Sequence, residues 1–297
     1  MPHSARGITF PPMPRCGTVA LAGRPNVGKS TLLNALVGEH LAIVAAKPQS
    51  TRVPVVGLLT QGDAQFILTD SPGLLEPEYP LHETMREAAV RAIADAEVIA
   101  YLHPLAEAPA PALEAVAKLE RAPRAPIVTV YTKADLVAPA NRPTVRPSDV
   151  VLSAVSGEGL DALLGALGSQ LPESPFHYDP EEIATQPLRF FAAEFVREAA
   201  FELLRLELPY SVACAIDEFR ESTSPVYIRA TLYVERDSQK GIVIGAGGRT
   251  IKALGQTART KIETLVGQPV YLDLHVKVLP RWRRDGPALH RLGYARA

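Results

Sequence analysis

Residues 23–31 read GRPNVGKST, a glycine-framed stretch that restricts what this chain can fold into. Gly23 and Gly28 enclose four residues and are followed by Lys29 and Ser30, the pattern G-x-x-x-x-G-K-[ST]. The glycines let the backbone turn so tightly that successive N–H groups point at one anion. In such a loop the lysine places its charge on the β- and γ-phosphates of a nucleotide, and the hydroxyl completes Mg²⁺ coordination.

The surroundings of this stretch agree with a phosphate-binding loop. CGTVALAG (16–23) is short, apolar and β-branched, which predicts a strand, and KSTLLNALVG (29–38) has helical spacing. The helix N-terminus then adds its dipole to the anion site. A glycine-rich turn with a chance lysine is the alternative. The predicted phosphate contacts are Gly23, Arg24, Pro25, Asn26, Val27, Gly28, Lys29, Ser30 and Thr31.

Strand-like and helical runs alternate as far as residue 171, after a predicted hairpin around Gln61-Gly62-Asp63. This alternation predicts an α/β unit over residues 15–171, with a mostly parallel sheet and helices on both faces. Residues 172–187 are rich in proline and acidic residues and are predicted to be a linker. Residues 188–297 are predicted to form a smaller α+β unit, in which a strand leads into a glycine-rich turn and a helix follows from about residue 249.

Further short motifs follow in the order that a GTPase requires. In DSPG (70–73), Asp70 is placed to hold Mg²⁺, and the Gly73 N–H to meet the γ-phosphate, with Ser71 and Pro72 beside it. Thr51, between the first helix and the second strand, is placed to close on Mg²⁺ only when a triphosphate is bound. Ser30, Thr51 and Asp70 are therefore the predicted metal ligands.

Two later motifs predict the base site. In TKAD (132–135), Asp135 is placed to accept hydrogen bonds from guanine N1 and N2, and the Lys133 stem to lie along the base. SAV (153–155) brings the Ala154 N–H toward guanine O6, beside Ser153. Together the motifs resemble the translation-factor-like GTPases. In those proteins the base motif begins with asparagine, so Thr132 is expected to loosen nucleotide binding.

The predicted catalytic residues are Lys29, Asn26, Thr51 and Gly73. In many GTPases a glutamine after D-x-x-G orients the attacking water, and here that residue is Leu74. Intrinsic hydrolysis is therefore expected to be slow and to be stimulated by a partner. Asn26 resembles the asparagine of potassium-activated GTPases, although loop geometry alone explains it equally well. Arg24 and Arg52 are expected in surface salt bridges.

The charge of the chain is divided unevenly. From residue 240 onward there are 11 Lys and Arg against 3 Asp and Glu, a balance of +8, and the remainder carries 20 against 29, a balance of −9. A basic C-terminal part favours a polyanionic partner, with a solvated basic surface as the alternative. G-x-x-G at 245–248 precedes a helix and resembles the KH module. The predicted RNA contacts are Lys240, Ile244, Gly245, Ala246, Gly247, Gly248, Arg249, Ile251 and Lys252.

A phosphate-loop GTPase followed by a KH domain resembles the Era family of bacterial GTPases. The stretches PFHYDPE, ELPYSVA and YVERDSQKGIVIG also carry this resemblance. It implies GTP and GDP as ligands, with 16S rRNA near its 3′ end and the precursor 30S subunit as partners, and no DNA. It also implies a cytoplasmic protein and allows loose attachment to the inner membrane. A constitutive RNA-binding chaperone with a weakened nucleotide site, and a GTPase acting on another RNA, are the alternatives.

Composition restricts the location of the chain. No apolar run approaches the ~20 residues that a membrane-spanning helix needs. The first 17 residues have no signal-peptide core and are expected to form a flexible proline-rich lead. Cys16 and Cys214 fit no metal-binding spacing and are expected to be idle or buried thiols in a reducing compartment.

Overall fold

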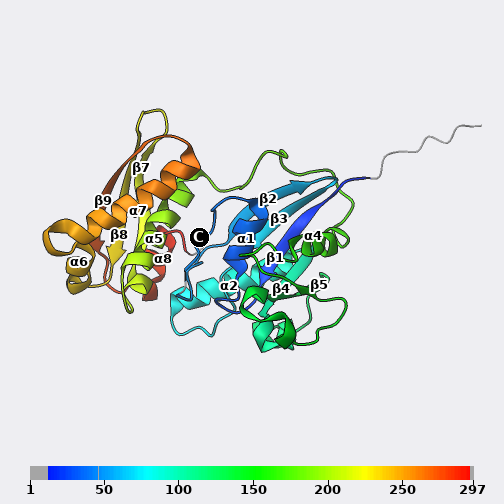
Figure 1. Ribbon diagram of the computed structural model, residues 1–297. Helices are drawn as coiled ribbons and strands as arrows, with labels where there is room; N and C mark the ends of the chain where they lie inside the picture. Colours follow the sequence, from blue (N-terminus) through cyan, green and yellow to red (C-terminus); the bar gives the residue numbers. More distant parts are fainter. Residues whose placement is uncertain (1–12, 46, 295–297) are drawn as a thin grey trace, which may run out of the picture.

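The computed structural model describes residues 13–45 and 47–294 (Figure 1), so most of the expected proline-rich lead lies outside the described residues. The first unit is built on a six-stranded sheet in the order β2-β3-β1-β4-β5-β6, in which only β2 is antiparallel to its neighbour. This confirms the predicted, mostly parallel sheet. Its strands are β1 (Arg15–Ala22), β2 (Val55–Gln61), β3 (Ala64–Asp70), β4 (Val98–Pro104), β5 (Ile127–Thr132) and β6 (Val150–Val151).

Helices cover both faces of this sheet because successive side chains of each strand point to opposite sides (Figure 1). On β1, Val19 and Leu21 share a core cluster with Leu33 and Leu163 of α1 and α4. Ala22 instead shares a cluster with residues of α2 and α3. The four helices are α1 (Lys29–Val37), α2 (Pro80–Asp95), α3 (Leu113–Ala117) and α4 (Leu160–Gly168).

Residues 172–187 run along the outer edge of the first sheet. The Leu58 N–H of β2 donates to the Ile183 carbonyl at 2.9 Å. The buried amide of Gln65 also accepts hydrogen bonds from the backbone N–H groups of His177 and Tyr178, at 2.8 and 3.0 Å. The segment predicted as a linker therefore covers an edge strand that would otherwise expose unpaired backbone groups.

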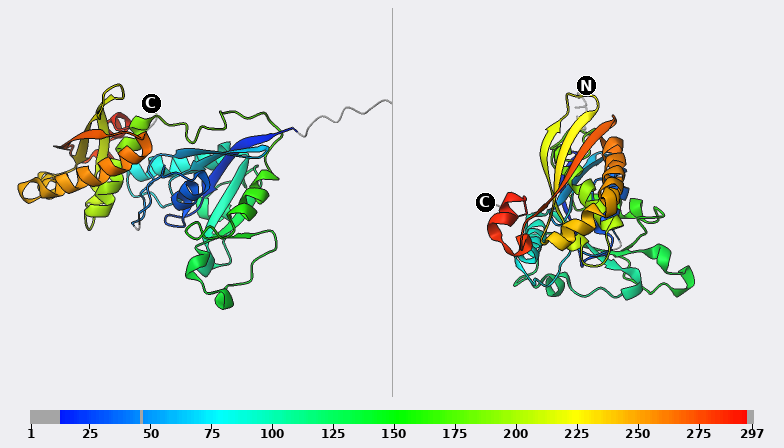
Figure 2. Two further views of the ribbon diagram at one scale, coloured as in Figure 1. Left: turned by 45° about the horizontal axis from the view of Figure 1, so that its top comes forward. Right: turned by 90° about the vertical axis from the view of Figure 1, so that its left-hand side faces the viewer.

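The second unit is a three-stranded sheet, β7-β8-β9, with helices against one face (Figure 2). β7 and β8 are antiparallel, and β8 and β9 are parallel. This confirms the predicted α+β unit. Its elements are α5 (Leu188–Leu203), β7 (Ala213–Arg220), β8 (Val226–Val234), α6 (Asp237–Ile244), α7 (Arg249–Val266), β9 (Val270–Val278) and α8 (Gly286–Arg291).

One local expectation about this unit is wrong. The glycine-rich turn was expected to follow a strand, but α6 lies between β8 and the turn, which therefore joins two helices. α6 begins where the Gln239 side chain accepts hydrogen bonds from the backbone N–H groups of Glu235 and Arg236, at 2.8 and 3.0 Å. Both cysteines are free and buried, as expected. In the described part of the chain, no helix is long and apolar enough to cross a membrane.

The two units meet where the loop between α1 and β2 lies on α5. Leu41 and Ala42 of this loop are buried in the same apolar cluster as Phe195 of α5. The Val44 N–H donates to the Glu198 carboxylate at 3.0 Å, and the Lys47 ammonium donates to the Phe201 carbonyl at 2.7 Å. The loop that carries Thr51 is therefore packed against both units.

Candidate functional sites

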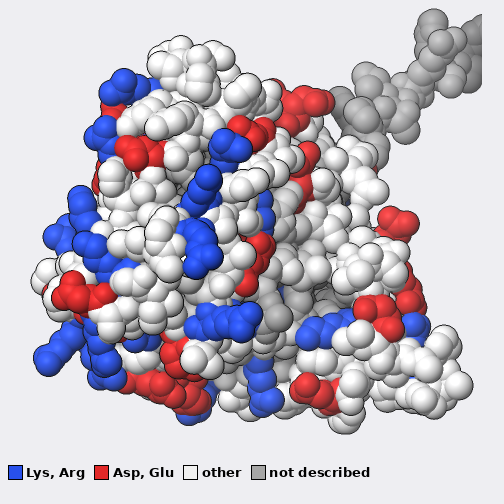
Figure 3. Space-filling view, turned by 60° about the vertical axis from the view of Figure 1, so that its left-hand side comes forward, with Lys and Arg blue, Asp and Glu red and all other residues white. Residues whose placement is uncertain are grey.

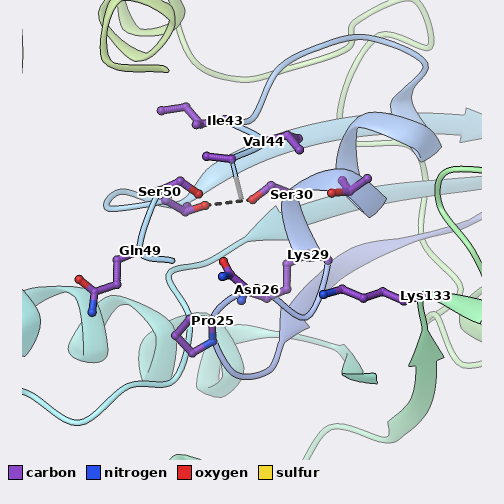
Figure 4. A pocket seen from close by; sticks show the side chains of 14 residues that line it. Pro25, Asn26, Lys29, Ser30, Ile43, Val44, Gln49, Ser50 and Lys133 are labelled. Atoms are coloured by element: carbon purple, nitrogen blue, oxygen red, sulfur yellow. Dashed lines mark hydrogen bonds between the residues drawn. The ribbon is translucent and has the colours of Figure 1, made fainter. Parts of the chain in front are cut away.

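The glycine-framed loop connects β1 to α1 at the carboxyl end of the sheet (Figure 4). Gly23 has φ +152°, and a Cβ there would lie 2.6 Å from the Leu102 carbonyl oxygen, so only glycine fits. Gly28, at φ +101°, precedes α1. The described helix α1 has neither a side-chain cap nor an acidic residue in its first turn. Its first N–H groups are therefore available to an anion.

Lys29 is buried at the base of this loop. Its ammonium donates to the Arg24 carbonyl at 3.0 Å and toward the Gly23 carbonyl at 3.4 Å. Burial lowers the pKa of Lys29 to about 8, while the nearby charge of Asp70 acts in the opposite direction. A buried ammonium held mainly by neutral carbonyls is well placed to gain from a phosphate.

Three side-chain oxygens from separate segments meet beside Lys29. The Ser30 hydroxyl donates to Asp70 Oδ2 at 2.6 Å. It also lies 3.0 Å from the Thr51 hydroxyl, the contact marked by the dashed line at Ser30 in Figure 4. Thr51 in turn donates to Asp70 Oδ2 at 3.3 Å. Asp70 is fully buried, its Oδ1 has no hydrogen-bond partner, and burial raises its pKa.

These three residues are the ones predicted to hold Mg²⁺, and the structure brings them together. Two hydroxyls and a carboxylate are hard oxygen donors of the kind that Mg²⁺ prefers. The unpartnered carboxylate oxygen of Asp70 also fits a cation or a water bound to one. Among the described residues there is no group of three or more His, Cys, Asp or Glu that could hold a metal. A metal here would therefore need phosphate and water oxygens as further ligands.

The DSPG segment lies directly against the phosphate loop. A Cβ on Gly73 would come within 2.6 Å of the Pro25 nitrogen, so a side chain at this position would push the two loops apart. The Leu74 N–H donates to the Gly23 carbonyl at 3.0 Å. The Leu74 side chain is buried with Ala89 and Ile93. It therefore points into the core and cannot orient a water molecule.

The cavity above the phosphate loop has a volume of about 210 Å³. Pro25, Asn26 and Lys29 lie on one side of it, and Ile43 and Val44 of the next loop lie on the other (Figure 4). A second cavity of about 170 Å³ adjoins it and shares Gly28, Thr31 and Lys133. Its lining also includes the predicted base-contact residues Thr132, Asp135 and Ala154.

The base cavity is braced from below by Ser153 and Thr132. The Ser153 hydroxyl donates to Asp135 Oδ1 at 2.6 Å and so holds the carboxylate in place. The Thr132 hydroxyl donates to the Val27 carbonyl of the phosphate loop at 2.7 Å. Thr132, the first residue of the base motif, is therefore connected to the phosphate loop.

The expectation of a surface salt bridge for Arg52 is wrong. Its side chain is 3% exposed, and the guanidinium donates to the Val212 carbonyl of the second unit at 2.6 Å. No local pattern around TR (51–52) indicated this, because its contacts lie more than 140 residues away in sequence. Arg24, in contrast, is exposed.

The second candidate site surrounds Gly245–Gly248. Gly245, Gly247 and Gly248 all have positive φ, at +73°, +60° and +75°. α7 follows, and this described helix begins without a side-chain cap or an acidic residue in its first turn. Ala246 and Arg249 are exposed, and the Arg249 guanidinium donates to the Ala246 carbonyl at 3.2 Å.

A groove of about 360 Å³ continues from this turn between α7 and β9. It contains the predicted Ile251 and Lys252, while Ile244 packs on the core and Lys240 is partly exposed on α6. The groove also contains candidate contact residues that the sequence analysis missed. Gln256 and Arg259 follow Lys252 by four and seven residues, so helical spacing could have placed them on the same face of the predicted helix. The missed lining residues are Gly255, Gln256, Arg259, Tyr271, Leu272 and Leu274.

Two family models match the chain. One, described as a 50S ribosome-binding GTPase, matches residues 18–133, and the other, a KH domain, matches residues 207–283. Among curated proteins, the chain is 42% identical to GTPase Era of Mycolicibacterium smegmatis, over 94% of this chain and 99% of that protein.

Two solved structures are similar over nearly the whole chain. One is a variant of Era from Aquifex aeolicus bound to GDP.AlF4−, with a TM-score of 0.88, 35% identity, and coverage of 95% of this chain and 100% of that chain. The other is Era in complex with MgGDPNP and nucleotides 1506–1542 of 16S ribosomal RNA, with a TM-score of 0.88, 35% identity, and coverage of 95% and 99%.

The lowered pKa of Lys29 predicts how GTP binding depends on pH. A bound triphosphate raises this pKa, because negative charge favours the ammonium form. The GTP affinity should therefore be constant below about pH 8 and fall up to about tenfold per unit as pH rises beyond it. Fluorescence titration between about pH 7 and about pH 9 measures this. In Lys29→Arg, whose side chain stays charged, the decline should vanish; an equal decline in both proteins would exclude Lys29 as its source.

The brace from Thr132 predicts the effect of removing one hydroxyl. Thr132→Val should weaken GTP binding and lower the free energy of unfolding by about 1–3 kcal/mol, because the Val27 carbonyl loses its buried donor. Thr132→Asn should leave GTP binding unchanged or tighten it. Thr129→Val, a buried threonine on the same strand, is the matched control, since its hydroxyl contacts Arg146 instead. Equal losses of GTP affinity in Thr132→Val and Thr129→Val would contradict the assignment.

Proposed function

The chain belongs to the Era family of GTPases, and from this premise we propose that it is a GTP-controlled switch that binds 16S rRNA near its 3′ end and assists maturation of the 30S subunit. The observation that carries the proposal is that a nucleotide site and a basic G-x-x-G surface occur on one chain. The relative bound to MgGDPNP and 16S rRNA nucleotides supports the choice of RNA.

Guanine selection follows from the two adjoining cavities. Asp135 accepts hydrogen bonds from guanine N1 and N2, with Ser153 fixing its orientation. The Ala154 N–H meets guanine O6, and the Lys133 stem covers the base. Adenine presents an acceptor at N1 and a donor at its position 6, so it offers the wrong pattern to both groups.

Hydrolysis depends on charge stabilisation rather than on a side-chain base. Lys29 and the first N–H groups of α1 hold the β- and γ-phosphates, and the Gly73 N–H faces the γ-phosphate. Ser30, Thr51 and Asp70 would hold Mg²⁺, which would neutralise charge on the phosphate oxygens. Because Leu74 is turned into the core, we infer slow intrinsic hydrolysis that a partner accelerates.

Asn26 is the residue through which K⁺ would act, because it lines the phosphate cavity. It also has φ +61°, a conformation that asparagine adopts more readily than most residues, so loop geometry explains it without a cation. Turnover measured in K⁺ and in Na⁺ separates the two explanations. A rate difference that Asn26→Ala removes favours K⁺, and equal rates leave loop geometry.

The RNA site we propose consists of the G-x-x-G turn and the groove beside α7. Figure 3 shows lysine and arginine side chains gathered over the second unit. Single-stranded RNA would lay its backbone on the turn and its bases in the groove, with Lys240, Arg249, Lys252 and Arg259 near the phosphates. Two buried free thiols fit a reducing cytoplasm, and attachment to the membrane is not part of the proposal.

Charge reversal at this turn tests the RNA proposal. Ala246→Asp with Lys252→Glu places carboxylates where phosphates would lie and spares the glycines that need positive φ. Affinity for an oligonucleotide from the 3′ end of 16S rRNA should fall at least about tenfold, while GTP affinity is retained. Anisotropy titration measures both.

Ala112→Asp with Arg121→Glu is the control, because it makes the same charge change at exposed positions of the first unit. Binding of the 16S oligonucleotide should then change little. If the Ala246 and Lys252 variant binds RNA normally while circular dichroism shows it folded, the turn is not the RNA site. Equal affinity of the unaltered protein for an oligonucleotide of the same length from 23S rRNA would favour another ribosomal target.

A further inference from the structure

The residue after Thr51 is anchored in the second unit. Besides the Val212 carbonyl, the Arg52 guanidinium donates to the Tyr210 carbonyl at 2.9 Å and toward the Pro209 carbonyl at 3.4 Å. It also lies over three aromatic rings of that unit, 5.5 to 5.9 Å from their centroids: Phe201, Trp282 and Tyr294. The carbonyls that accept hydrogen bonds from Arg52 and the rings beneath its guanidinium, which together form its socket, therefore all belong to the second unit.

Ser50, the residue before Thr51, is held by a side chain of the second unit. Arg197, on α5, donates to the Ser50 carbonyl at 2.6 Å. Its guanidinium is fully buried and also forms two hydrogen bonds to the Glu194 carboxylate, at 3.0 and 2.5 Å. Two arginines therefore fix the chain on either side of Thr51. Arg52 extends from the first unit into the second, and Arg197 extends from α5 to the backbone of the first unit.

Joining the two units through Arg52 carries an unfavourable desolvation free energy, because a charged group is buried. No ion pair between Arg52 and a carboxylate is found in the described part of the chain, and burial lowers its pKa. The two buried guanidiniums also share one ring, because Arg197 lies 5.7 Å from the Phe201 centroid. An apolar side chain of similar length would fill the socket without burying this charge. The desolvation penalty of the buried Arg52 charge favours a role for this residue beyond holding the two units together.

The position of Thr51 supplies that role. Neighbouring Cα atoms are only about 3.8 Å apart, so a shift of Ser50 or Arg52 moves Thr51 with it. The Thr51 hydroxyl must lie within hydrogen-bonding distance of Ser30 and Asp70 to join the metal site. The groups that hold the two neighbours of Thr51 lie on α5 and on residues 209–212, so these groups help to set its place.

We propose that Arg52 and Arg197 are positioning residues for Thr51, through which the second unit completes the Mg²⁺-triphosphate site of the first. The inference rests on the proposed function, since it takes Thr51 as a ligand used only with a triphosphate. Displacement of α5 or of residues 209–212 withdraws Thr51 and weakens GTP, but not GDP. Because coupling is reciprocal, GTP also favours the arrangement in which the socket is filled.

The test compares Arg52→Met with Lys47→Met in the full-length protein. Methionine can lie against the three rings of the socket, so docking of the units should persist. In Arg52→Met, affinity for a non-hydrolysable GTP analogue should fall roughly tenfold, with GDP affinity within about twofold. The Mg²⁺ concentration for half-maximal retention of the analogue should rise.

Lys47→Met removes another contact between the same loop and α5 without touching a neighbour of Thr51. It should leave the ratio of GTP-analogue to GDP affinity unchanged. An equal change of this ratio in Lys47→Met would show general adhesion and overturn the proposal. So would an unchanged ratio in Arg52→Met. If Arg52→Met does not fold, Arg52→Lys, which keeps the charge but loses the planar fork, should shift the ratio in the same direction.

A double-mutant cycle tests whether Arg52 acts through Thr51. Thr51→Val should weaken the GTP analogue as Arg52→Met does, and the double variant should be no weaker than either single one. Additive losses would overturn the proposal. Amide hydrogen exchange of residues 48–52, with the analogue bound, should be faster in Arg52→Met than in Lys47→Met. If the unaltered protein binds no GTP, the proposed function fails; if it does and the cycle is additive, only this inference fails.

Discussion

The hydrogen bonds that join Ser30, Thr51 and Asp70 are the interaction on which the rest of the structure depends. Each residue stands at a different point of the fold: the start of α1, the loop before β2, and the end of β3. The pairing of Leu21 with Asp70 in neighbouring parallel strands brings Asp70 level with the phosphate loop. Binding of a metal at this point would therefore require all three segments to be in place together.

Close backbone packing makes this meeting point rigid. Gly23 lies against the Leu102 carbonyl and Gly73 against Pro25, so the phosphate loop is held between β4 and the DSPG segment with no space for a side chain. Thr132 adds a hydrogen bond from the end of β5 to the same loop. Thr51 differs from these residues, because its segment is held mainly by the second unit. Thr51, which we propose joins the metal site only with a triphosphate, is thus the one of these residues whose neighbours are anchored in the second unit.

The sequence predicted the features that local patterns encode. Strands and helices of the first unit follow from hydrophobic periodicity, and the phosphate loop from glycines and a lysine whose chemistry requires their spacing. α6 was missed because Gly241 and β-branched residues in DSQKGIVI weaken any helical pattern, and because its start depends on one side-chain contact from Gln239. The burial of Arg52 could not be predicted, since its aromatic socket forms only when Phe201, Trp282 and Tyr294 meet in the folded chain.

The central claim of this account is that the nucleotide site controls RNA binding through the contact between the two units. It is tested most directly by the affinity of the unaltered protein for a 16S 3′-end oligonucleotide, measured at one salt concentration with GDP and with a non-hydrolysable GTP analogue. The account predicts RNA binding that is several-fold tighter with the analogue, because a triphosphate holds Thr51, and with it the second unit, in one arrangement. Equal RNA affinity in the two nucleotide states would contradict it.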